Sequence, residues 1–235
     1  VSTDVVIPPD LVRETVESDN DRTVAAEIIH RPADLKVVSV EAPAQNFSGE
    51  KTTVTWTVRN DGAAVWRGTR MWTDFVYLSP DPVFIPGRAT IIGAKAHDNS
   101  GGLAAGASYT ESLEVTLPAG IGGEYFLYVV ADDDPRSNGT PDLNPEPKSG
   151  DNDWSRDRLY SVRAYEDGAQ VNNMQRGTIP VTYREPDLKV SELVIPPGEL
   201  LSGQTVTVEF TVANEGTRAT RQAYWWDRLY LSRDP

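Results

Sequence analysis

The sequence predicts an all-β protein made of tandem immunoglobulin-like β-sandwich modules, and two observations carry that prediction: an alternation of apolar and polar residues, and a repeated block. Within residues 51–60, Val54, Trp56 and Val58 alternate with threonines. This pattern is typical of a strand with one face on a core. The 17 prolines and 18 glycines leave few stretches long enough for a helix.

Further runs of the same character follow one another along the chain, with Gly, Pro, Asn and Asp between them. They cover residues 34–40, 72–79, 90–95, 109–117, 124–131 and 177–183. Asn60-Asp61-Gly62 predicts a turn directly after the run at 51–60. Short strands at this spacing are typical of an immunoglobulin-like sandwich.

Two different blocks occur twice, and their order defines the modules. Residues 34–82 return as 187–235, and residues 9–21 return without a gap as 141–153 in the frame P-D-L-x-x-E-x-x-x-x-D-N-D. The acidic block precedes the other block in both places. We therefore expect 1–33 to be the C-terminal tail of a preceding module, 34–185 a complete immunoglobulin-like module, and 186–235 the N-terminal part of a following one, cut from a longer array.

Composition excludes several function classes. A net charge of −13 disfavours nucleic acid and anionic membrane as partners, since both would repel this surface. No apolar run reaches the roughly 20 residues of a membrane helix, so we expect no membrane insertion. The chain has no cysteine and only two histidines, and no nucleophile, zinc or phosphate-loop motif selects a catalytic residue. We expect no enzyme.

Several short motifs occur in the same order in both blocks: the starts at Pro32–Leu35 and Pro186–Leu188, the Ser-Gly turn, the Asn-x-Gly turn and the W-x-D-x-x-Y-L-S strand, together with the acidic E-x-x-x-x-D-N tail. In these motifs the chain resembles the CARDB family, the cell adhesion related domains of large bacterial surface proteins. The resemblance implies a secreted or surface-attached immunoglobulin-like sandwich without catalysis, often in tandem. We accordingly expect a structural or adhesive segment of a large repetitive bacterial protein, located outside the cell or on its surface. Neighbouring modules, or copies of the chain assembled into a fibre, would be its partners. Residues 154–171 have no counterpart in the first tail and lie outside the resemblance.

The acidic tails are the candidate metal site, because calcium takes six to eight oxygen ligands from carboxylates, amides and carbonyls. The candidate ligands are Asp132, Asp134, Asp142, Asn144, Glu146, Asp151, Asn152 and Asp153, with Asp10, Glu14, Asp19 and Asn20 in the first copy. Both copies precede a module boundary, where a cation could also reach Asp34 or Asp187 and stiffen the joint. The alternative is a solvated acidic loop inherited by duplication.

Aromatic residues support a second function class, a carbohydrate-binding module that contacts surface glycans. Trp56, Trp72 and Trp225 have positions typical of packing, whereas Trp66 or Trp154 could stack on a sugar.

The repeated Asp74 and Asp227 are either ligands or residues that tie a strand to a loop through backbone hydrogen bonds. We expect the isolated His97 to lie in a loop.

Overall fold

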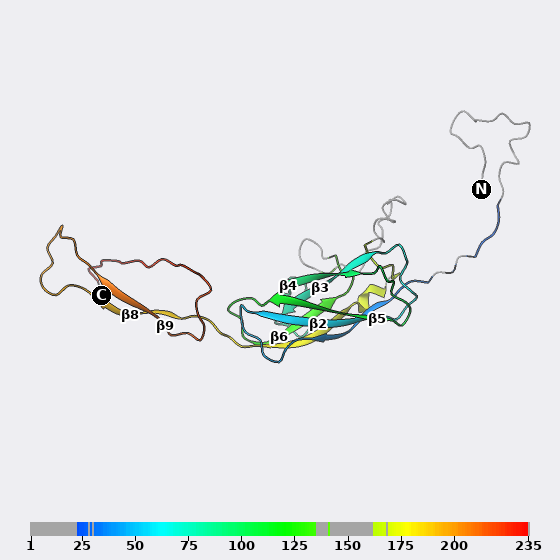
Figure 1. Cartoon of the computed structure of the whole chain (residues 1–235), viewed down its shortest axis with the longest axis horizontal. Helices are drawn as coiled ribbons and strands as arrows, with labels where there is room; N and C mark the ends of the chain where they lie inside the picture. Colours follow the sequence, from blue (N-terminus) through cyan, green and yellow to red (C-terminus); the bar gives the residue numbers. More distant parts are fainter. Residues whose placement is uncertain are drawn as a thin grey trace, which may run out of the picture. The chain divides into compact units, whose positions relative to one another are not determined.

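A computed structural model describes residues 23–27, 29, 31–134, 141, 162–167 and 169–234, without the side chains of 169 and 170 (Figure 1). The chain divides into two compact units between Arg31 and Pro32, and the fold below is that of the second unit. The predicted tail 1–33 lies mostly outside the described residues, so the predicted module boundaries stay a prediction.

Seven of the strands form a β-sandwich, as the sequence predicts. They are β1 (Leu35–Glu41), β2 (Lys51–Asn60), β3 (Met71–Ser79), β4 (Thr90–Asp98), β5 (Ser108–Thr116), β6 (Gly123–Val130) and β7 (Met174–Val181). One sheet has the order β1-β2-β5 and the other the order β4-β3-β6-β7, with all neighbours antiparallel. Because β4 pairs with β3, the sandwich has three strands in one sheet and four in the other.

The core lies between these two sheets, where the alternating residues of β2 meet those of β3 and β6. Val54, Trp56 and Val58 are fully buried and share one apolar cluster with Trp72 and Leu127. The side chains between them on β2 are threonines that face outward, and Thr55 and Thr57 hydrogen-bond across to β5. The period of two in the sequence is therefore the burial pattern of this strand.

A smaller apolar cluster covers the outer face of the four-stranded sheet. Phe84, from the β3–β4 loop, lies edge-on to Tyr77 at 5.5 Å and to Tyr128 at 5.2 Å between ring centroids. The Tyr128 hydroxyl donates to the Asp81 carbonyl at 2.8 Å and so fixes the loop to the sheet.

The segment after β1 joins the two sheets through a parallel contact with the end of β7. Phe47 and Thr182 form a parallel bridge. The Ser48 N–H donates to the Thr182 carbonyl at 3.0 Å, and the Thr182 N–H donates to the Asn46 carbonyl at 2.8 Å. This pair of bonds connects the beginning of the sandwich to its last strand.

The hairpin of β8 (Leu188–Val194) and β9 (Glu209–Asn214) repeats the geometry of β1 and β2. Both pairs carry a register shift at corresponding positions, between Val37 and Ser39 and between Val190 and Glu192. Within the described part of the chain no second sheet covers β8 and β9, and the hairpin exposes its apolar face.

The helical content of the described ranges is one short 3₁₀ turn, η2 (Ala169–Asn172), just before β7. No helix in those ranges has the length and hydrophobicity that crossing a bilayer would require.

Candidate functional site

The predicted calcium ligands are described at two positions, Asp132 and Asp134. The others lie outside the described residues: Asp10, Glu14, Asp19, Asn20, Asp142, Asn144, Glu146, Asp151, Asn152 and Asp153. In the described ranges no three His, Asp or Glu side chains come together as a metal-binding group. The calcium site therefore stays a prediction for the acidic tails.

Asp132 is not arranged as a metal ligand. Its carboxylate is buried directly after β6, where Oδ1 lies 2.9 Å from Nε of Arg163 and Oδ2 accepts the Ala164 N–H at 2.9 Å. Burial raises the pKa of Asp132, and the Arg163 guanidinium opposes that rise. Since an internal cation already neutralises this carboxylate, a metal ion would have to displace Arg163 to bind it.

Asp74 ties β3 to the loop after β6, which confirms the structural interpretation of this repeated residue. Its fully buried carboxylate accepts the Trp56 indole N–H at 2.8 Å, the Tyr109 hydroxyl at 2.9 Å and the Asp132 backbone N–H at 3.1 Å. Burial raises the pKa of Asp74 to about 6, although the three donors act in the opposite direction. Its carboxylate oxygens therefore accept hydrogen bonds from groups inside the domain.

Residues 162–167, part of the stretch that the resemblance left unexplained, attach to the start of β1. The buried Glu166 carboxylate accepts the Leu35 N–H at 2.7 Å and the Asn173 side-chain amide at 2.9 Å. The Ala33 N–H donates to the Tyr165 carbonyl at 3.0 Å. Burial raises the pKa of Glu166 to about 7. Sequence analysis missed this role, since an isolated glutamate in a polar stretch looks like a solvated one.

The expectation that His97 lies in a loop is wrong. The residue is in β4, its ring stacks on Tyr109 at 3.7 Å between centroids, and it lies 4.6 Å from the Trp72 ring. Its Nδ1 is 3.2 Å from a Glu111 carboxylate oxygen. Stacking on Tyr109 and a tilted contact with Trp72 explain why a polar ring sits at the edge of the core.

The tryptophans divide into buried and exposed sets. Trp56 and Trp72 are core residues, as expected. Trp225 is half exposed, contrary to the packing expectation, because no described sheet faces β8 and β9. Trp66 is 52% exposed and Trp226 is 87% exposed, whereas Trp154 lies outside the described residues. Trp66 therefore keeps the accessibility that contact with a glycan requires.

A charged cluster joins the sandwich to the segment after β9. The Arg221 guanidinium pairs with the Glu185 carboxylate and donates to the Ser48 carbonyl at 2.9 Å. Nearby, Arg218 Nη1 lies 3.0 Å from Glu50 Oε1. The Ser48 hydroxyl donates to Glu185 at 2.8 Å, as does the Gly120 N–H. We call these residues, Ser48, Glu50, Gly120, Glu185, Arg218 and Arg221, the Glu185 cluster.

The electrostatics of this cluster are those of a strongly held ion pair. The hydrogen bond from Arg221 lowers the pKa of Glu185 to about 2, and the Gly120 N–H contributes in the same direction. The carboxylate is thus ionised at any ordinary pH, so the pairing persists in neutral and mildly acidic solution.

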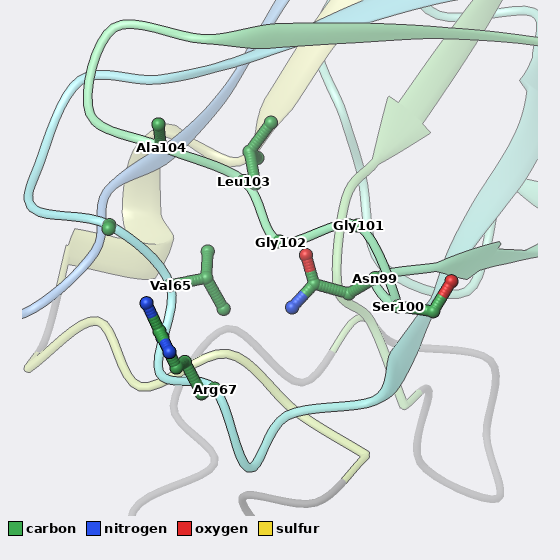
Figure 2. A pocket seen from close by; sticks show the side chains of 9 residues that line it. Val65, Arg67, Asn99, Ser100, Gly101, Gly102, Leu103 and Ala104 are labelled. Carbon is green, nitrogen blue, oxygen red and sulfur yellow. The ribbon is translucent and has the colours of Figure 1, made fainter.

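A cleft of about 480 Å³ opens between the β2–β3 loop and the β4–β5 loop (Figure 2). Its walls are Ala64, Val65 and Arg67 on one side and residues 99–104 on the other. Figure 2 shows the Asn99 side chain directed into the space between the two loops. We call this the Asn99 cleft.

Comparison with known proteins gives a family for the part of the sandwich that holds β1 to β6. Residues 32–138 match the CARDB family model. These residues are a CARDB domain. CARDB is a cell adhesion related domain of bacteria, and the family is non-catalytic. No curated protein matches the chain.

Solved structures similar to the chain include another CARDB domain, that of the PF1109 protein from Pyrococcus furiosus in complex with di-metal ions. It shares 13% identity at a TM-score of 0.36, over 66% of this chain and 99% of that one. β-Glucosidase 3B from Thermotoga neapolitana shares 14% identity at a TM-score of 0.33, and this chain spans 16% of its length. β-Glucosidase EmGH1 from Erythrobacter marinus shares 13% identity at a TM-score of 0.34, again over 16% of its length. At these scores the likenesses carry no functional argument.

Proposed function

We propose that the chain is a structural or adhesive segment of a large, repetitive bacterial protein, located outside the cell or on its surface. In this proposal the CARDB domain is a spacer whose orientation toward the following module is fixed. The single observation that carries it is the Glu185 cluster. In this cluster Arg221, from the segment after β9, pairs with Glu185 and donates to the Ser48 carbonyl. Arg218, from the same segment, pairs with the Glu50 carboxylate.

The reasons why this cluster favours a rigid joint are geometric. Glu185 lies two residues after Tyr183 in the connection between β7 and β8, and it accepts donors from the sandwich and from the segment after β9. Ser48 and Glu50 add a second point of attachment through Arg221 and Arg218. Two attachments beside the covalent link restrict bending and twisting more than one could.

The repeated hairpin supports the repetitive character of the parent protein. In the CARDB domain Asn60 Oδ1 accepts the Asp34 and Gly62 N–H groups at 3.0 and 3.1 Å. In the second hairpin Asn214 Oδ1 accepts the Asp187 N–H at 3.0 Å in the same way. The same hydrogen bond between the turn asparagine and the aspartate at the start of the block therefore occurs at the same place in both blocks. A duplicated module would retain such a bond.

The test is NMR relaxation on the whole chain. If the cluster holds, backbone amides of β8 and β9 should tumble with the same correlation time as those of β1–β7, and Arg218→Gln with Arg221→Gln should make the hairpin tumble faster. Lys189→Gln is the matched control, because Lys189 pairs with Glu215 inside the hairpin and touches no cluster residue. Independent tumbling in the unaltered chain would sink the proposal.

We also propose that calcium binds the acidic tails. Its ligands would be drawn from Asp134, Asp142, Asn144, Glu146 and Asp151–Asp153 in the second tail, and from Asp10, Glu14, Asp19 and Asn20 in the first. Their donor chemistry suits a hard cation. Sites with affinities of about 0.1–1 mM in a roughly millimolar medium would add about 0.4–1.4 kcal/mol each, so stiffening would exceed the gain in stability. Calorimetric titration should show saturable calcium uptake that Asp142→Asn with Asp151→Asn abolishes. Absence of uptake contradicts this proposal and leaves the one above intact.

A further inference from the structure

We infer that the Asn99 cleft binds an acidic saccharide, a uronic acid unit of a surface or environmental polysaccharide. This goes beyond a spacer role, because it gives the CARDB domain a ligand site of its own. The observation that begins the argument is a polar atom without a partner. Asn99 is 6% exposed, and its Oδ1 accepts no hydrogen bond from any residue that the structure describes.

The amide of Asn99 is held in one orientation, so the unpaired oxygen is a fixed feature. Its Nδ2 donates to the Thr69 carbonyl at 2.8 Å, and its backbone N–H donates to the Arg70 carbonyl at 2.9 Å. A buried acceptor without a donor costs free energy that a ligand hydroxyl would recover. The ligand must therefore present a hydrogen-bond donor at this point.

Hydrogen bonds hold the two loops of the cleft in a fixed position relative to each other. The Val65 N–H donates to the Leu103 carbonyl at 2.9 Å and ties the two loops together at one end, while the contacts of Asn99 tie them at the other. Val65 and Leu103 are buried and supply an apolar base. Two anchored loops around an apolar base with a few polar groups have the form of a small-ligand site, and the volume lies in the usual range.

The charge of the cleft selects an anion. Among the described residues, Arg67 is the one charged residue that lines it, its side chain is exposed, and no described carboxylate pairs with it. The nearby Asp98 carboxylate is occupied by the Ser100 N–H and hydroxyl, both at 2.9 Å, and does not line the cleft. The chain as a whole carries a net charge of −13, so a positively charged side chain that lines a cleft stands out from the overall charge of the protein. A guanidinium matches a carboxylate well.

A uronic acid unites both requirements, because its carboxylate and hydroxyls lie on one ring. Trp66, between two lining residues, leaves half of its surface exposed as an apolar face for a second sugar ring. An acidic peptide is the weaker candidate. Peptides gain affinity by pairing with a sheet edge, and the cleft is bordered by loops.

The experiment is calorimetric titration of the whole chain with short oligogalacturonates in EDTA, which prevents a calcium bridge between acidic groups. We expect saturable binding, and a loss of affinity of about tenfold or more for Arg67→Ala. Arg70→Ala is the matched control: it removes the same charge from the same loop, outside the cleft, and should bind like the unaltered chain. Unchanged melting temperatures would show that both variants fold.

Four outcomes would overturn the inference. They are no binding, equal binding of a neutral oligogalactoside of the same length, equal binding of oligoglutamate, and equal losses for Arg67→Ala and Arg70→Ala. A second readout locates the ligand, because NMR shifts on titration should centre on the Asn99 side-chain amide and the backbone amides of Gly101 and Gly102. Shifts confined to other surfaces would equally count against it. The relaxation test of the joint is independent of these results, so each proposal can fail alone.

Discussion

Gly62 and Gly216 show at the residue scale why the repeated Asn-x-Gly turn ends in glycine. A Cβ at Gly62 would lie 2.6 Å from the backbone of Ala33 and Asp34, and a Cβ at Gly216 would lie 2.4 Å from the Asp187 nitrogen. Backbone atoms cannot move aside as a flexible side chain can. The glycine is thus required by the close passage of the chain that enters each hairpin.

Gly62→Ala should therefore destabilise the CARDB domain by about 1–3 kcal/mol, because the new methyl group forces the backbone apart. Urea unfolding followed by tryptophan fluorescence would measure the change. Gly101→Ala is the matched control, since a Cβ at that position meets no atom within 4 Å. Equal stability of the two variants would refute the argument.

The buried carboxyl groups give the domain a defined pH dependence. Asp74 has its pKa raised to about 6 and Glu166 to about 7, against ordinary values of 3.8 and 4.5. The folded state therefore binds these protons more tightly than the unfolded state does. Their contribution to stability is complete below about pH 4 and is lost as pH rises through 6 to 7.

The melting temperature should accordingly fall between pH 5 and pH 8, and Glu166→Gln should flatten part of that fall. The expected change in the free energy of unfolding is about 1–3 kcal/mol between these two pH values. Glu114→Gln serves as the control, because Glu114 is exposed and pairs with Lys51 on the surface. A pH profile that Glu166→Gln leaves unchanged would show that this carboxyl titrates normally.

At the scale of elements, Asn60 and Asn214 occupy equivalent ends of two hairpins in different surroundings. The Asn60 side chain is fully buried and also donates to the Ala63 carbonyl. The Asn214 side chain makes the corresponding bonds but is exposed. Water can replace lost partners at Asn214, whereas it cannot reach those of Asn60.

Asn60→Ala should cost about 2–4 kcal/mol, because it leaves buried donors and an acceptor without partners. Asn214→Ala should cost about 1 kcal/mol or less and act on the second hairpin alone. Hydrogen exchange of the β1–β2 and β8–β9 amides would separate the two effects. If both variants loosen only their own hairpin to the same extent, burial is not what distinguishes the sites.

The strands were predictable from sequence to within a few residues, whereas several of their polar contacts were not. Alternation along β2 shows which side chains face the core, and the Asn-Asp-Gly turn marks its end. Alternation does not say which sheet receives β4. Nor does it reveal that Glu166 meets Leu35, 131 residues away in sequence, or that His97 stacks on Tyr109. Such contacts depend on the packed sandwich, so no local pattern carries them.

At the scale of the whole molecule, the Glu185 cluster predicts how the joint responds to acid. The pKa of Glu185 lies near 2, below its ordinary value of 4.5. A carboxyl group whose pKa is lowered by folding stabilises the folded state at pH values above its unfolded pKa. That contribution is lost as the pH falls through the folded pKa. The joint should therefore stay ordered at pH 7 and at pH 4 and loosen as the solution approaches pH 2.

Glu185→Gln at pH 7 should reproduce the acid result without exposing the sandwich to acid. NMR relaxation of the β8 and β9 amides would report it as faster local tumbling. Glu199→Gln, a carboxyl that takes no part in the cluster, is the control. A Glu185→Gln chain that behaves like the unaltered one would mean that Ser48 and Glu50 alone hold the joint.

The parallel contact between Ser48 and Thr182 has a mechanical consequence. The chain enters the sandwich through β1 and leaves it through β7, so tension on the two ends draws the segment after β1 and the end of β7 in opposite directions. Bonds between parallel segments lie across that direction and share the load, whereas a hairpin pulled open at its end breaks its bonds one by one. The Ser48–Thr182 and Thr182–Asn46 hydrogen bonds would thus act together as a shear clasp, and the domain should resist stretching before any strand peels away.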